Sequence, residues 1–211
     1  MLLVKDTKNR FGAVSVFLHW YVAAAIFFLL PTGLVIDYFG PHGPLRALRA
    51  DLTWWHMSIA VTSVPFFLFR IFWRARNGKP MTHDQHWALK FTADSVWRLL
   101  LLLIVWQIFT GPLLELSHNN PVHWFYINLI RPPLPDWILV YQGYFYNAHV
   151  YGAYAIGGLL VLHVGGALKH HLVDRDEVLI RMLRPRAPET DIGMEPKPFG
   201  GKTRPEAVPG E

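Results

Sequence analysis

The chain has 211 residues, of which 52% are hydrophobic and 17% are charged, with eleven histidines and no cysteine. An average soluble protein has about 25% charged residues, so this chain is poor in charge. Without cysteine it can form no disulfide, thiolate zinc site, iron–sulfur cluster or covalently attached c-type haem. The net charge of +5 would favour a nucleic-acid partner only if the basic residues shared one surface. Their distribution along the chain excludes that partner.

Four apolar stretches contain no charged side chain at all: residues 11–36, 52–69, 99–114 and 137–168. A helix that rises 1.5 Å per residue needs roughly 20 apolar residues to cross a bilayer. The first stretch has that length, and it is too long for the apolar part of a cleaved signal peptide. The second and third reach it when Arg70 and Arg98 extend their cations to the interface, giving spans near 52–73 and 96–116.

The fourth stretch divides into an interfacial segment, Trp137–Tyr144, and a span over 145–172. Residues 116–130 are also uncharged, but the polar run from Ser117 to Pro121 indicates a loop there. Prolines at 31, 65 and 112 are expected to kink or end the helices that contain them. The sequence therefore predicts an all-α integral membrane protein, a bundle of four transmembrane helices.

Basic residues predict the orientation of this bundle. Sixteen of the 20 Lys and Arg lie in the N-terminal segment, the 70–90 region and the C-terminal region, against three in the two opposite loops. This bias places both termini in the cytoplasm. Residues 185–211 contain six prolines and four glycines, so we expect a four-helix domain over 1–184 and a disordered cytoplasmic tail over 185–211.

Four histidines fall inside the predicted spans: His19, His56, His149 and His163. Ionisable side chains at membrane depth are costly, so each is a candidate functional residue. His149 and His163 are fourteen residues apart on one helix. This spacing brings them within about 40° of the same face and separates them by roughly 21 Å along the axis. One helix therefore presents one imidazole near each membrane surface.

Depth assigns a partner to each of these two histidines. His56 and His149 both lie about four residues inside spans that enter from the outer side, roughly 6 Å deep. His19 and His163 lie roughly 9 and 13 Å from the cytoplasmic side. The predicted pairs are therefore His56 with His149 and His19 with His163.

Facing imidazoles in apolar surroundings favour b-type haem with two axial histidines, packed non-covalently between helices. A structural zinc site would need four ligands, and no carboxylate accompanies either pair. A proton relay would need further polar groups across the spans. The glycines of the last span are compatible with close approach of a porphyrin and equally with ordinary helix packing.

Several motifs resemble the bacterial cytochrome b561 family. They are His19-Trp20 in the first span, Trp55-His56 in the second, and the run LHVGGALKHHLVDRDEVLIRML over 162–183. The resemblance covers roughly residues 8–184. It implies a four-helix inner-membrane bundle with two b haems, and His19, His56, His149 and His163 as their axial ligands. It also implies quinone as a redox partner.

Some members of that family resemble superoxide oxidases, which take an electron from periplasmic superoxide and pass it to ubiquinone. The leading hypothesis is therefore an oxidoreductase of this kind in the respiratory chain. The alternative is a haem b relay or anchor subunit of a larger complex, such as a hydrogenase or a formate dehydrogenase. A haem-free membrane scaffold is a third class. Arg70, Arg74, Lys169 and Arg175 are candidates to pair with haem propionates, or serve only as positive-inside anchors.

Overall fold

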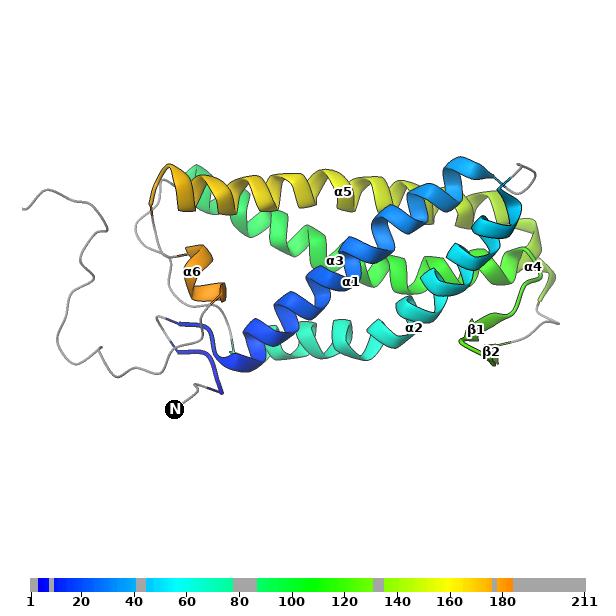
Figure 1. The fold of residues 1–211 in the computed structure, drawn as a ribbon, viewed down its shortest axis with the longest axis horizontal. Coiled ribbons are helices and arrows are strands. Elements are labelled where there is room, and N and C mark those ends of the chain that lie inside the picture. The colour runs from blue at the N-terminus through cyan, green and yellow to red at the C-terminus, as the bar shows by residue number, and fades with distance from the viewer. Residues whose placement is uncertain are drawn as a thin grey trace, which may run out of the picture.

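The structure, a computed structural model, describes residues 4–7, 10–40, 45–77, 87–130, 135–175 and 178–183. Its body consists of four long helices, α1 (Ala13–Phe39), α2 (Arg46–Asn77), α3 (Trp87–Ser117) and α5 (Gln142–Leu172) (Figure 1). All four are long and apolar enough to cross a membrane. The prediction of four spans is confirmed.

The helices extend beyond the charge-free stretches. A helix of 31 residues, the length of α3 and α5, measures roughly 46 Å, whereas the hydrocarbon core is roughly 30 Å thick. Their ends therefore reach the polar interfaces, where charged side chains cost little. Pro31, Pro65 and Pro112 lie inside α1, α2 and α3 and end none of them. Neighbouring helices can satisfy the backbone groups that a proline frees within a membrane.

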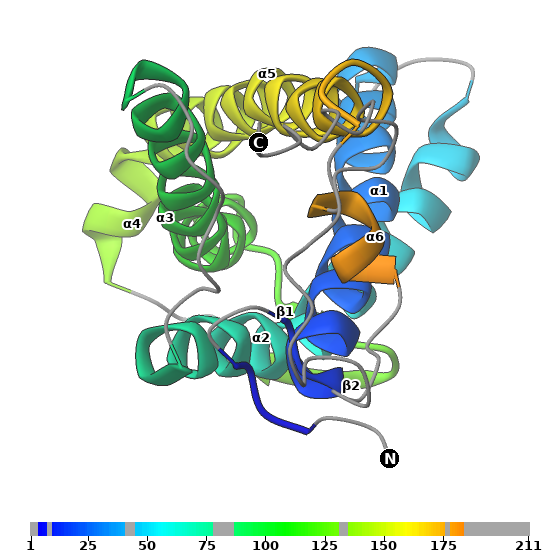
Figure 2. The same cartoon turned by 90° about the vertical axis from the view of Figure 1, so that its left-hand side faces the viewer.

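Two helix pairs make up the bundle. α1 packs along α2 and α3 packs along α5, and the end-on view shows the four helices as the sides of a rough square (Figure 2). One core cluster joins α1, α2 and α3 through Val22, Ala25, Phe67 and Ile104. A second core cluster consists of Met57, Leu116, Val122, Ile138 and Phe145.

The predicted loop at 116–130 contains a β-hairpin, so the fold is mostly helical rather than purely helical. β1 (Val122–Trp124) pairs antiparallel with β2 (Ile127–Ile130). The indole of Trp124 donates to Thr62 Oγ1 at 2.9 Å, and the N–H of Phe125 donates to Ser58 Oγ at 3.0 Å. These strands of three and four residues are held by α2, which explains why local sequence did not reveal them.

Two short helices complete the fold. α4 (Asp136–Val140) opens the predicted interfacial segment before α5. α6 (Val178–Leu183) lies at the end of the bundle where α1 begins, and the indole of Trp20 donates to the carbonyl of Met182 at 2.8 Å (Figure 1). The predicted tail, 185–211, lies outside the described residues.

Candidate functional site

The structure brings the four intramembrane histidines together as two pairs. The ring centroids of His56 on α2 and His149 on α5 are 6.4 Å apart. Those of His19 on α1 and His163 on α5 are 6.2 Å apart. After the membrane sides that the sequence predicts for them, we call the first the outer pair and the second the inner pair. In both, α5 supplies one imidazole and the α1–α2 pair supplies the other.

These distances can be compared with axial coordination of one metal ion. A metal about 2 Å from each imidazole nitrogen, with each nitrogen about 1 Å from its ring centre, puts the two ring centres about 6 Å apart. Among the described residues, no group of three or more His, Asp or Glu side chains could hold a metal ion. Two-histidine pairs therefore fit a group that brings its own equatorial ligands, as a porphyrin does.

Glycines on α5 divide into two kinds. A Cβ at Gly152 would lie 2.9 Å from Gln107 Oε1 and 3.0 Å from Trp106 Cδ1, so this glycine allows close packing of α3 on α5. A Cβ at Gly158, Gly165 or Gly166 would meet nothing within 4 Å. The sequence allowed two explanations for the glycines of the last span, helix packing and close approach of a cofactor. At Gly152 the structure supports helix packing.

The outer pair has neutral hydroxyl groups as neighbours. Nδ1 of His56 lies 3.0 Å from Thr32 Oγ1 on α1. Nδ1 of His149 lies 3.3 Å from Thr110 Oγ1 on α3, and the backbone carbonyl of His149 accepts from Gln107 Nε2 at 3.1 Å. Sequence reasoning missed both threonines. The Thr-Gly dipeptide that occurs in two apolar spans, at 32–33 and 110–111, is the signal that would have pointed to them.

The inner pair has a cation as its neighbour. Nη2 of Arg70 on α2 lies 3.1 Å from Nδ1 of His19. Arg74, one turn further along α2, lies over the rings of Phe11 and Trp97, 5.8 and 5.5 Å from their centroids. Two of the predicted propionate partners therefore lie at the inner end of the bundle, and Arg70 is in direct contact with the pair.

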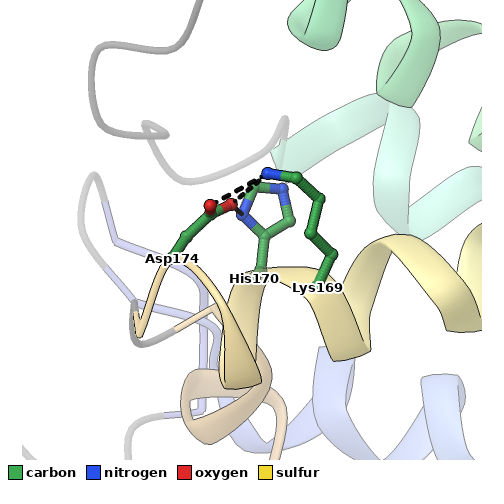
Figure 3. A network of polar contacts seen from close by, with 3 residues as sticks. All are labelled: Lys169, His170 and Asp174. Carbon is green, nitrogen blue, oxygen red and sulfur yellow. Dashed lines mark hydrogen bonds and ion pairs between the residues drawn. The ribbon is translucent and has the colours of Figure 1, made fainter.

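A third predicted partner, Lys169, has an acidic neighbour at the end of α5. Its ammonium lies 2.7 Å from Asp174 Oδ2, and His170 Nδ1 lies 3.1 Å from the same oxygen (Figure 3). The hydrogen bond from Lys169 lowers the pKa of Asp174 below its ordinary value. Arg175 follows with a positive φ of 53°. The structure gives Lys169 a local role at the end of α5.

Three further polar groups lie at the end of the bundle that is predicted to face outward. The carboxylate of Asp37 on α1 accepts hydrogen bonds from Tyr146 and, at 3.4 Å, from Tyr154 on α5. Arg49 Nε donates to the carbonyl of Ile36 at 3.2 Å. Nε2 of His123 on β1 is buried and has no hydrogen-bond partner among the described residues.

Four membrane-length helices with two half-buried histidine pairs, whose ring centroids lie 6.4 and 6.2 Å apart, are typical of one class of protein, the polytopic b-type cytochromes. Comparison with known proteins narrows the class. A model of the family described as prokaryotic cytochrome b561 matches residues 10–185, and the chain belongs to this family. It is a bacterial membrane cytochrome that binds b-type haem and takes part in electron transport.

One curated relative supports this assignment. Cytochrome b561 homolog 2 from Escherichia coli (strain K12) is 26% identical over 180 residues, which cover 84% of this chain and 93% of the relative. The resemblance noted in the sequence is thereby confirmed.

Proposed function

We propose that this cytochrome holds two b-type haems, one between His56 and His149 and one between His19 and His163. We propose further that it transfers single electrons between a donor on the periplasmic side and the quinone pool. The observation that carries the proposal is the presence of both pairs at ligation distance, with α5 common to the two. Bound haem supplies a one-electron iron couple whose potential depends on its axial ligands and surroundings.

The protein's own residues position and shield these sites. One imidazole of each pair comes from α1 or α2 and the other from α5, so each is fixed by a long helix rather than a loop. His149 and His163 are separated by roughly 21 Å along α5, which spreads the two sites along the membrane normal. The basic-residue bias supports an inner-membrane orientation with both termini in the cytoplasm.

Superoxide is the donor that we propose. Each superoxide gives up one electron and leaves as O₂, and two electrons with two protons convert one quinone to quinol. Positive charge would steer an anionic donor. The predicted outer loops hold three arginines against four carboxylates, a net charge of −1, so the steering is assigned to the local pair Arg46 and Arg49. Arg46 is exposed at the start of α2, Arg49 lies one turn on, and the Asp37 carboxylate nearby is hydrogen-bonded to tyrosine hydroxyls.

A rapid superoxide pulse tests this donor. We expect the oxidised holoprotein to be reduced faster than superoxide dismutates, and a quinone analogue to reoxidise it. Replacing both Arg46 and Arg49 with Gln should slow the reduction and weaken its dependence on ionic strength, because steering of an anion is screened by salt. Absence of reduction by superoxide would overturn the choice of donor. Reduction only by a co-purifying dehydrogenase would favour the relay subunit instead.

A further inference from the structure

A Thr-Gly pair on a neighbouring helix contacts each histidine of the outer pair. Thr32 and Gly33 on α1 face His56, and a Cβ built on Gly33 would lie 3.2 Å from Cε1 of that imidazole. The missing side chain at Gly33 therefore leaves the space that the ring occupies, because real Cβ atoms rarely approach a neighbour so closely.

The same arrangement of a threonine and a glycine against a histidine occurs on α3. Thr110 and Gly111 face His149, and a Cβ built on Gly111 would lie 3.2 Å from Cε1 of His149. In both cases the threonine contacts Nδ1 and the following glycine makes room for Cε1. The two outer imidazoles thus have equivalent Thr-Gly contacts, one from α1 and one from α3.

The threonine hydroxyls determine which ring nitrogen carries hydrogen. A hydroxyl has one hydrogen to donate. Thr32 Oγ1 lies 2.8 Å from the carbonyl oxygen of Phe28 and 3.1 Å from that of Leu29, so its hydrogen is directed to the backbone. Toward His56 it can only accept. Nδ1 of His56 must then be the donor, which leaves Nε2 with a lone pair.

Thr110 imposes the same tautomer on His149. Its Oγ1 donates to the carbonyl of Trp106 at 2.9 Å or to Gln107 Oε1 at 3.2 Å. Nδ1 of His149 therefore carries hydrogen too. The nitrogen that a metal binds is set by the hydrogen bond that the other nitrogen makes. Both outer imidazoles are held with Nε2 ready to coordinate.

The inner pair is arranged differently. A guanidinium only donates hydrogen bonds, so Arg70 at 3.1 Å requires a lone pair on Nδ1 of His19. A neutral His19 then carries its hydrogen on Nε2, the opposite tautomer. Ligation through Nε2 requires Arg70 to leave Nδ1, and a haem propionate is the acceptor to which a guanidinium would move.

We propose that Thr32–Gly33 and Thr110–Gly111 are positioning residues that preset the outer pair for haem, whereas the inner pair must first break its contact with Arg70. The outer site therefore fills first. This inference rests on the proposed ligation by the two pairs. It adds an order of loading and a role for four residues that are not ligands in the proposed function.

Haem titration of the unloaded protein tests the order directly. With less than one equivalent of haem, we expect the absorbance and midpoint potential of the outer site alone. His163→Ala and His149→Ala proteins serve as references for the outer and inner sites. Filling of the inner site first, or of both sites together, would overturn the proposal. If either reference variant kept two haems, the ligand assignment itself would be wrong.

Threonine variants test whether the hydroxyls of Thr32 and Thr110 position the outer histidines. Thr32→Val and Thr110→Val keep the branched shape but remove the acceptor, and loss of such a partner typically lowers metal affinity about 10–100-fold. We expect that loss at the outer haem, with an upward shift of its midpoint potential, because the imidazole becomes less basic. Thr32→Ser and Thr110→Ser should restore both values.

Thr53→Val is the matched control. Thr53 also donates to a carbonyl four residues back, that of Arg49 at 2.8 Å, and the described residues show no hydrogen bond from its hydroxyl to either pair. Its variant should behave as the wild type. An unchanged outer affinity and potential in both Thr32→Val and Thr110→Val, in proteins whose His149→Ala variant loses one haem, would overturn this inference and leave the proposed function standing.

Discussion

At the scale of single residues, the two histidine pairs differ more in their neighbours than in their spacing. The outer imidazoles face the hydroxyls of Thr32 and Thr110, and His19 in the inner pair faces the guanidinium of Arg70. Electrostatic surroundings tune a haem's potential along with its ligands. The two proposed haem sites, with the same kind of ligands, would thus differ in chemistry through neighbouring residues that are not ligands in the proposal.

Asp174 offers a residue-scale prediction about the end of α5. Because the hydrogen bond from Lys169 lowers its pKa, ionised Asp174 stabilises this helix end at pH values above the ordinary pKa of about 3.9. That stabilisation is lost as the pH falls through the lowered pKa of the folded protein.

Replacing Lys169 with Met should move the pKa of Asp174 back up, as followed by carboxyl-carbon NMR during a pH titration. Lys90→Met, a change on exposed α3 surface, is the control and should leave the titration unchanged. An unmoved Asp174 in Lys169→Met would show that another group holds the carboxylate ionised.

At this scale helix geometry converts chain position into membrane depth, and the sequence thereby predicted that His56 faces His149 and that His19 faces His163. The structure places the rings of these pairs 6.4 and 6.2 Å apart, while their ligation of haem stays a prediction. The sequence could not predict Thr32, Thr110 or Arg70 as neighbours of these histidines. A contact between α1 and His56, or between α3 and His149, depends on how each helix is rotated about its own axis, which residue spacing alone does not reveal. The sequence also left four basic residues as equal candidates to pair with haem propionates. The structure distinguishes two of them, because Arg70 contacts His19 whereas Lys169 forms an ion pair with Asp174.

At the scale of elements, α5 is the common helix of the site, since it supplies one imidazole to each pair. The other imidazoles of the two pairs come from α1 and α2, while α3 contacts His149 through Thr110 and Gly111. A helix without a ligand therefore contributes to the geometry of the outer pair. The hairpin β1–β2 closes the outer end against α2.

Ser58 supplies an element-scale prediction. This residue is 0% exposed, and its hydroxyl accepts the backbone N–H of Phe125. Ser58→Ala leaves that N–H unpaired, at a cost of about 1–3 kcal/mol. We expect the hairpin to open more often, so that chymotrypsin cleaves beside Phe125 or Tyr126 at least about 5-fold faster.

The control for that experiment is Thr92→Ala on α3. Thr92 is exposed and its hydroxyl donates to the carbonyl of Ala88 within its own helix, far from the hairpin in the chain. It should be cleaved at the wild-type rate. Equal rates for Ser58→Ala and the wild type would mean that the hairpin does not depend on this contact.

Helix existence was predicted well at this scale, because gaps in charge identify membrane-length segments without any alignment. The hairpin and α6 were not predicted. Their three to six residues carry too little periodicity, and both are held by contacts distant in sequence, Phe125 with Ser58 and Trp20 with Met182.

At the scale of the whole molecule, the uneven distribution of Lys and Arg predicts the orientation of the protein in the membrane. The chain has no cysteine, so a single introduced thiol can be labelled without background. Asn120 lies in the turn after α3 and Lys90 lies near the start of that helix, and both are exposed. We predict that a membrane-impermeant maleimide labels Asn120→Cys in intact cells and Lys90→Cys only after the membrane is opened. The reverse pattern would place both termini outside.

The central claim is that one chain holds two haems between two histidine pairs. Pyridine haemochrome analysis of the purified protein, with its His149→Ala and His163→Ala variants, tests this most directly. We predict two b haems per wild-type chain and one in each variant, with different midpoint potentials for the haem that remains. A single haem in the wild type, or two haems in either variant, would contradict the account.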